Sequence, residues 1–207
     1  MPDISTAGPD GTRLVLDLAL TLRHDGNGGV ADDLHTPQGL TTWVRDHAAE
    51  LPLDTGYSAD EEDLRQVCAV RAAVRTLFAH AVRPGEPSPA DARRLLPVAD
   101  AVARLNTAAA RVPAVPVLHW QEDDGAPTVR ETATGDAPAA DLLTAALARA
   151  ALAFLTGPDR QRLRACHAPR CVRYFLKEHP RQEWCRPSCG NRARVARHHE
   201  RHNSRTQ

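Results

Sequence analysis

The sequence predicts a mainly α-helical protein with one small β-hairpin, an α+β fold in which a helical domain precedes a treble-clef-like four-cysteine zinc finger. Apolar residues recur at steps of three and four along several segments of the first 159 residues, which is the spacing of an amphipathic helix. Four cysteines cluster near the C-terminus, and the charge of the chain changes sign just before them. We therefore expect two domains, over residues 1–159 and 160–207.

Charge is divided unequally between these two parts, although the 207 residues together have a formal net charge of zero. Residues 1–159 carry 13 arginines and 23 acidic residues, a net charge of −10. Residues 160–207 carry 12 arginines, one lysine and three acidic residues, a net charge of +10. This pattern favours a basic module that faces a polyanion, and docking of the two halves on each other is the alternative.

The first element is ambiguous from periodicity alone. Leucines alternate over residues 14–22, as in a strand, but Leu14, Leu18 and Leu22 also share one face of a helix with Val15. We expect a helix over residues 13–22, followed by a polar, glycine-rich loop over residues 25–35.

The next two helices have clear start signals. Thr36-Pro37 combines an N-cap with a proline at the first helical position, so a helix is expected from there to about Leu51. Ser58, which closely precedes three acidic residues, is expected to cap the longest helix. That helix should end at the Arg-Pro-Gly sequence of residues 83–85.

A further helical stretch is expected to start at Ser88-Pro89 and to be kinked or broken at Pro97. Its inward face should comprise Leu95, Leu96, Ala99, Val102 and Leu105. Beyond it, residues 115–120 and 128–132 flank turn residues 122–125, which predicts a two-stranded hairpin.

The body should end with one more helix. Asp136 is expected to cap a helix over about residues 138–156, and Gly157-Pro158 should end it. The finger then begins within a few residues, so it should be held close to the body.

The N-terminus has no basic start leading into an apolar core, so no secretory signal is expected. No apolar stretch approaches the roughly 18 residues of a membrane span. We expect a cytoplasmic protein that contacts no membrane, in which clustered cysteines favour a metal ion over disulfides. The fifth cysteine, Cys68, lies alone on an apolar helical face and should be an inert buried thiol.

The clustered cysteines are Cys166, Cys171, Cys185 and Cys189, with the spacing C-x4-C-x13-C-x3-C. Two close thiol pairs separated by a loop can place four thiolates about 2.3 Å from one tetrahedral Zn²⁺ ion. Such a site is structural, because no position remains open for water or a substrate.

A different ligand set has to be weighed. His198 and His202 could join Cys185 and Cys189 in a finger of two cysteines and two histidines, but eight residues separate Cys189 from His198 where such fingers have about twelve. That set would also leave the first cysteine pair without a metal, so we favour the four cysteines. His167, next in the chain to the first cysteine, is the alternative ligand.

The residues between the cysteine pairs predict the treble-clef-like order. Residues 172–176 resemble a strand and residues 177–181 a turn, after which Trp184 returns beside the second pair. Tyr174, Phe175 and Trp184 are expected to form the small core of the finger in preference to a base-stacking platform.

The second cysteine pair should lie at the start of a helix. Ser188 is expected to cap that helix, so the thiolate of Cys189 lies in the first turn and is stabilised by the helix dipole. Gly190 should allow the backbone to pass close to the metal.

An arginine stripe follows on the same helix. Arg194, Arg197 and Arg201 lie at i, i+3 and i+7, and a single glutamate interrupts the basic run. Such a stripe can follow a phosphate backbone or enter a major groove, whereas a solvated charged face is the alternative. The candidate nucleic-acid contacts are Arg192, Arg194, Arg197, His198 and Arg201.

The run Cys189-Gly190-Asn191-Arg192, with Trp184-Cys185 before it and Ala-Arg-Val-Ala-Arg-His after it, resembles the bacterial CGNR zinc-finger family over about residues 160–202. The body is similar to the ABATE domain that usually precedes this finger, on Leu16-Asp17-Leu18, Trp43 in the helix after Thr36-Pro37, and the hairpin near residues 117–120. The resemblance implies a stress-associated transcription regulator, with the four cysteines as zinc ligands and the terminal helix contacting DNA.

Together these features predict a zinc-dependent, DNA-binding transcriptional regulator whose body senses a small-molecule effector or mediates association, for example as a homodimer. A zinc-stabilised protein-interaction or RNA-binding module is the alternative. We do not expect an enzyme, because the body has scattered histidines and acids but no spaced metal ligands, glycine-rich phosphate loop or nucleophile motif.

Overall fold

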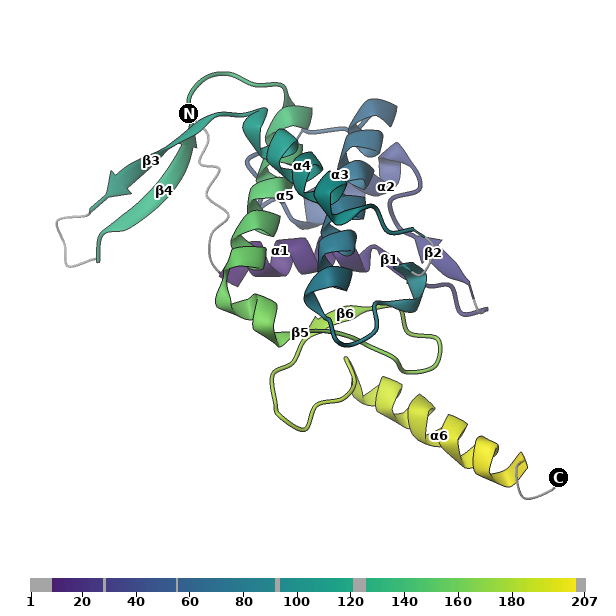
Figure 1. Ribbon diagram of the computed structural model, residues 1–207. Coiled ribbons are helices and arrows are strands. Elements are labelled where there is room, and N and C mark those ends of the chain that lie inside the picture. Colours follow the sequence, from purple (N-terminus) through teal and green to yellow (C-terminus); the bar gives the residue numbers. More distant parts are fainter. Residues whose placement is uncertain (1–8, 28, 55, 92–93, 121–125, 204–207) are drawn as a thin grey trace.

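A computed structural model describes residues 9–203 except for residues 28, 55, 92–93 and 121–125. It consists of a helical body, a hairpin that projects from the body, and a small module from which a last helix extends (Figure 1). The helices are α1 (Pro9–Leu20), α2 (Pro37–Asp46), α3 (Glu61–Ala81), α4 (Val98–Ala110), α5 (Ala139–Thr156) and α6 (Pro187–Asn203). The strands are β1 (Leu22–His24), β2 (Val30–Asp32), β3 (Ala114–His119), β4 (Thr128–Ala133), β5 (Leu163–Ala165) and β6 (Tyr174–Leu176).

Each pair of successive strands forms a two-stranded antiparallel sheet. The mainly α prediction is confirmed, but the body has two hairpins where one was predicted. The ambiguous first segment is a helix, since Leu14, Val15, Leu18 and Ala19 are all fully buried at helical spacing. The loop expected over residues 25–35 is shorter than predicted, because β1 and β2 pair across it.

The capping predictions have mixed outcomes. Thr36 caps α2 as expected, since its hydroxyl accepts from the Gly39 N–H at 3.2 Å, but α2 ends at Asp46 and does not reach residue 51. The cap of α3 is Asp60, so the Ser58 prediction is wrong. Asp60 accepts from the Asp63 N–H at 2.8 Å, and the Asp63 carboxylate accepts from the Asp60 N–H at 3.2 Å. This reciprocal capping box satisfies two helix-end donors, which a serine at position 58 could not do.

The helix expected from Ser88 is a single 3₁₀ turn, η1 (Pro89–Asp91), and α4 begins only after Pro97. The buried face of α4 comprises Ala101, Leu105 and Ala108. The predicted inward positions Leu95, Ala99 and Val102 are exposed, so that prediction is wrong except at Leu105 and the partly buried Leu96. In this alanine-rich helix the packing against α3 and α5 selects which face is buried.

The predicted hairpin is present, with Leu118 opposite Val129, and its expected turn residues 122–125 lie outside the described residues. It projects from the body in Figure 1. The helix that follows, α5, has no side-chain cap, so the expected role of Asp136 is wrong. Gly157 ends α5, donating its N–H to the carbonyls of Ala153 and Phe154 at 2.9 and 3.2 Å.

The α5 helix is more apolar than we expected of any segment. Its 18 residues have a mean hydropathy of 1.5, so by length and composition alone it could cross a membrane, contrary to the expectation from sequence. Half of it is buried in the protein, where it packs against α1, α3 and α4. Its Phe154 ring lies 5.0 Å from that of Phe78 on α3. This packing is typical of a helix in the core of a protein.

The finger is built into the same core as the body. A second 3₁₀ turn, η2 (Pro158–Arg162), leads from α5 into β5. Leu163 on β5 and Tyr174 on β6 are both buried in the main hydrophobic cluster, and the Tyr174 ring lies 5.4 Å from that of Phe78. The body and the finger are therefore packed against each other, not merely joined in sequence.

Candidate metal centre and nucleic-acid interface

The first cysteine pair lies in the turn of the β5–β6 hairpin. Cys166 directly follows β5 and extends the pairing, since its N–H donates to the Arg173 carbonyl at 2.9 Å. The Cys171 N–H donates to the Ala168 carbonyl at 2.9 Å, which closes a tight turn between the two thiols. The strand expected over residues 172–176 starts only at Tyr174. It pairs with β5, which precedes it in the chain, so the turn of this hairpin contains the first cysteine pair.

The second pair lies at the start of α6. The N–H groups of Cys189 and Gly190 donate to the Arg186 carbonyl at 3.0 and 3.3 Å. The helix begins at Pro187, a residue with no N–H to satisfy, and Ser188 is already inside it, so the predicted serine cap is wrong.

Gly190 allows close approach of the Trp184 side chain, whereas the prediction was close approach of the backbone to the metal. A Cβ atom at this position would lie 3.1 Å from Cδ1 of Trp184, so the missing side chain lets the indole ring approach the helix. Trp184 and Phe175 pack against the buried cysteines, which confirms them as core of the finger. The same expectation is wrong for Tyr174, which belongs to the core of the body.

The four sulfur atoms have the geometry of a tetrahedral metal site. All four Sγ atoms lie within 4.8 Å of one another, with Cys171 to Cys185 at 3.6 Å and Cys185 to Cys189 at 3.5 Å. Four thiolates bound about 2.3 Å from a tetrahedral zinc ion are about 3.8 Å apart, so the cluster fits one zinc ion. Cys166, Cys171 and Cys189 are buried and Cys185 is partly buried, as a closed structural site requires.

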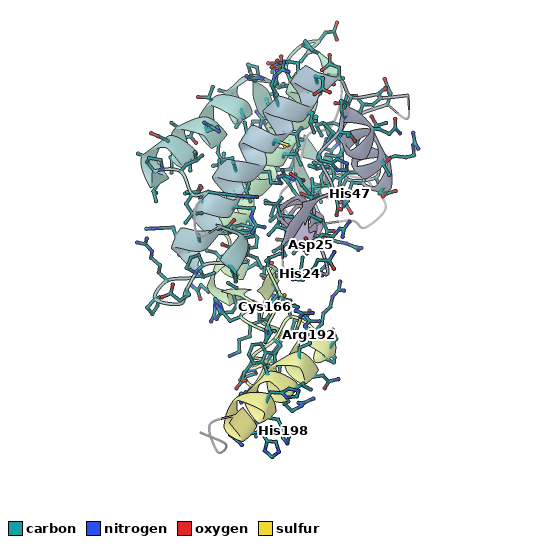
Figure 2. The ribbon with its side chains drawn as sticks, turned by 90° about the vertical axis from the view of Figure 1, so that its right-hand side faces the viewer. His24, Asp25, His47, Cys166, Arg192 and His198 are labelled. Atoms are coloured by element: carbon teal, nitrogen blue, oxygen red, sulfur yellow. The ribbon has the colours of Figure 1, made fainter. Side chains whose placement is uncertain are left out.

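The histidines of the alternative ligand sets lie outside this cluster. His198 is far along α6 from Cys166 in Figure 2, and His167 is exposed. Among the residues that the structure describes, the four cysteines are the group of potential ligands brought close enough to hold a metal ion.

Hydrogen bonds shift the pKa values of Cys166, Cys171 and Cys185 in different directions. Hydrogen bonds from Cys171 and then Cys185 lower the pKa of the Cys166 thiol, and the same bonds raise the pKa of Cys171 and of Cys185. The N–H groups of Cys185 and Ala168 also lower the pKa of Cys166. Four thiolates this close repel one another, so a divalent cation is needed to keep all four deprotonated.

The side chain of Arg192 makes contacts that the sequence did not predict. Its Nη2 donates to the Cys189 sulfur at 3.0 Å and its Nε to the Pro169 carbonyl at 3.0 Å, so it ties α6 to the turn that holds the first cysteine pair. Hydrogen bonds of this kind orient metal ligands and offset thiolate charge. Arg192 was predicted as a nucleic-acid contact, and the structure engages its guanidinium in supporting the metal centre.

The remaining predicted contacts lie along one helix. Arg194, Arg197, His198 and Arg201 are exposed on α6, while Ala193 on the same helix is buried against the finger. Arg194 donates to the Asn191 side chain one turn earlier, and the rings of His198 and His202 lie 5.6 Å apart.

A buried polar network fastens the finger to the body. The Tyr174 hydroxyl donates to Asp91 Oδ2 at 2.7 Å, and Arg75 Nε donates to the other oxygen, Oδ1, at 2.7 Å. Ser88 donates from its hydroxyl to the Val172 carbonyl at 2.8 Å and from its N–H to the Tyr174 hydroxyl at 3.3 Å. Burial raises the pKa of Tyr174, so its hydroxyl stays protonated and remains a donor.

Sequence reasoning missed this network, although one signal was present. Arg71 and Arg75 lie four residues apart on the apolar face of α3, and a charged group on such a face requires a buried partner. Arg71 pairs with Asp32 on β2 through two contacts, at 2.6 and 2.7 Å, and Arg75 pairs with Asp91 on η1.

A helical body that ends in a four-cysteine finger with an exposed basic helix defines a zinc-finger protein. Residues 12–158 match the ABATE family, described as "Putative stress-induced transcription regulator", and residues 162–202 match the CGNR zinc finger. The chain belongs to the ABATE family and carries a CGNR zinc finger behind the ABATE domain, which confirms the resemblance found in the sequence. Among curated proteins, none matches the chain.

Proposed function

We propose that the protein is a zinc-dependent, DNA-binding transcriptional regulator of the cytoplasm, in which α6 contacts DNA. The observation that carries the proposal is the position of α6, which extends away from the body and the hairpins with its basic side chains exposed (Figure 1). Both family descriptions, of a transcription regulator and of a zinc finger, support this assignment.

The zinc site gives the helix a fixed direction. Cys189, Arg192 and Ala193 hold the first turns of α6 to the finger, and the finger is held to the body through Tyr174. The 17 residues of α6 give it a length of about 25 Å. The major groove of duplex DNA is wide enough to admit an α-helix. Exposed arginines on such a helix can contact phosphates or base edges.

Substitution of the stripe tests this proposal. Replacement of Arg194, Arg197 and Arg201 together by alanine should weaken duplex DNA binding and flatten its salt dependence. Each lost phosphate contact removes about 0.9 from the slope of log affinity against log salt concentration, so three contacts remove roughly 2.7. Fluorescence anisotropy with a random duplex at several salt concentrations measures the slope.

A matched control removes the same charge elsewhere. Arg45, Arg83 and Arg104 are exposed on the body, and their joint replacement by alanine should leave the slope within experimental error. An unchanged slope in the α6 variant would remove α6 from the DNA interface. Preference for single-stranded RNA at matched salt would favour the RNA-binding alternative, and an acidic protein partner that DNA cannot displace would favour a protein-interaction module.

For the body we propose association between two copies of the chain, alongside effector sensing. The β3–β4 hairpin exposes a group of large apolar side chains, with 47 to 69% of their surface accessible: Val115, Leu118, Trp120 and Val129. A two-stranded hairpin is marginally stable alone, and such a surface gains stability when a second copy covers it.

Joint replacement of Leu118 and Trp120 by serine should therefore shift the protein from dimer to monomer in sedimentation velocity experiments. The control is Val195→Ser, because Val195 is also exposed, at 56%, but lies on α6. A wild-type protein that sediments as a monomer at every working concentration would contradict association through the hairpin.

A further inference from the structure

A cationic cavity lies where the body meets the finger. It has a volume of about 410 Å³ and is bounded by the β1–β2 hairpin on one side and by the finger and the first turn of α6 on the other. Figure 2 shows His24 of the hairpin directly next to the part of the finger that holds Cys166 and Arg192. Its basic lining residues are Arg23, His24, Arg170, Arg173, Arg186 and Arg192.

The cavity is much larger than the space that zinc needs. A zinc ion lies inside the tetrahedron of sulfurs, about 2.3 Å from each. A volume of 410 Å³ is within the range of small-ligand sites, about 300–1,000 Å³. The metal therefore accounts for one wall of the cavity and leaves room for a further ligand.

Three of the arginines lack a counter-charge among the residues that the structure describes. Arg23 pairs with Asp33 at 2.6 Å, and Arg192 donates to Cys189 and Pro169. In the described part of the chain, no carboxylate lies within ion-pair distance of Arg170, Arg173 or Arg186. Like charges that converge on one cavity repel each other, and an anion between them removes that cost.

His24 adds a donor that has no acceptor in the described part of the chain. The Gly26 N–H donates to its Nδ1 at 2.8 Å, so in the neutral ring the hydrogen is on Nε2. Nε2 is buried and has no hydrogen-bond partner among the described residues. Buried donors are nearly always paired, and none of the described residues supplies an acceptor for this one.

The backbone of the first cysteine turn also suggests a site. Arg170 has a φ of 62°, a left-handed conformation that favours glycine. Arg170 also lines the cavity, and strained residues of this kind concentrate where ligands bind.

We propose that this cavity binds a phosphate group. A phosphate has several acceptor oxygens in a tetrahedral arrangement, so it can accept from guanidinium groups on different elements at once, and arginine binds it through paired hydrogen bonds. The positive end of the α6 dipole, at the same wall, further favours an anion. The phosphate belongs either to a small phosphorylated molecule or to the backbone of DNA bound along α6.

Titration of inorganic phosphate into the zinc-loaded full chain, at ionic strength held constant with sodium chloride, tests the site by calorimetry. Joint replacement of Arg173 and Arg186 by glutamine should weaken phosphate binding at least about a hundredfold, since each lost charge-assisted bond costs about tenfold or more. Arg170→Gly should also weaken binding while relieving the left-handed backbone.

The matched control is Arg181→Gln. Arg181 is an exposed arginine of the same finger that does not line the cavity, so its replacement should leave phosphate binding unchanged. Zinc content and circular dichroism of each variant separate a lost contact from a lost fold.

A second arm distinguishes the two sources of phosphate. If phosphate displaces duplex DNA and the Arg173 and Arg186 variant binds DNA more weakly, the cavity holds a backbone phosphate. If phosphate binds and DNA affinity is unaffected, the cavity holds a free phosphorylated molecule. No phosphate binding, together with unchanged DNA affinity in the double variant, would overturn the proposal. The calorimetric arm uses no DNA, so its result is independent of the proposed role of α6.

Discussion

Replacement of Cys189 by serine is expected to abolish zinc binding and to unfold the finger. The Cys189 sulfur lies 3.5 Å from that of Cys185 and accepts a hydrogen bond from Arg192, so its loss opens the tetrahedron and frees the start of α6. Structural zinc contributes an apparent binding free energy of about 10–16 kcal/mol in finger peptides, and this becomes folding free energy. The expected result is a fall from one zinc ion per chain to none, measured by metal analysis.

The structure adds that the body should lose stability with the finger. The reason is that Leu163 and Tyr174 of the finger are buried in the body's core. We therefore expect the thermal unfolding midpoint of the body to fall in the Cys189 variant and in the chelated wild type. A body that melts unchanged would show that the two cores are energetically independent.

Cys68→Ser is the control for this experiment. Cys68, the fifth cysteine, lies on α3 and outside the metal cluster, and its thiol donates to the Leu34 carbonyl at 3.7 Å. Burial raises its pKa, which agrees with the predicted inert thiol, although the side chain is only partly buried. This variant should retain one zinc ion, and a wild-type protein without zinc would contradict the metal assignment.

Replacement of Asp91 by alanine is expected to destabilise the protein by about 3–5 kcal/mol, because it leaves a buried arginine without its counter-charge. The side chains of Asp91 and Arg75 are each only 3% exposed, and Asp91 accepts hydrogen bonds from both Arg75 and Tyr174. Urea denaturation followed by circular dichroism measures the free energy of unfolding.

Two further variants separate the parts of this network. Tyr174→Phe keeps the ring against Phe78 and removes the hydrogen bond to Asp91, so it should cost about 1–3 kcal/mol. Glu62→Ala breaks an exposed ion pair with Arg65 and should change stability little, since solvent screens such pairs. A loss below about 1 kcal/mol for Asp91→Ala would mean that Arg75 finds another partner or that water reaches it.

The elements that could be predicted from the sequence are those whose signals are local. The cap at Thr36, the C-terminal end of α5 and the β3–β4 hairpin follow from residues within a few positions of one another, and they were predicted correctly. The cap at Asp60 was missed because Ser58 and Asp60 are both good caps, and only the reciprocal bond with Asp63 separates them. The three residues of β5 carry no strand signal of their own and become a strand by pairing with β6.

By itself, the sequence determined that four cysteines form a metal site and that a basic helix follows them. Their spacing specifies the chemistry, because thiols a few residues apart on a turn and on a helix start can converge on one ion. Only the tertiary structure decided what surrounds that site. The bond between Tyr174 and Asp91 joins residues 83 positions apart, and Arg192, one of the expected DNA contacts, donates to the Cys189 sulfur. Such contacts are selected by the packing of whole elements and by the need to pair buried charge, and no local spacing encodes either one.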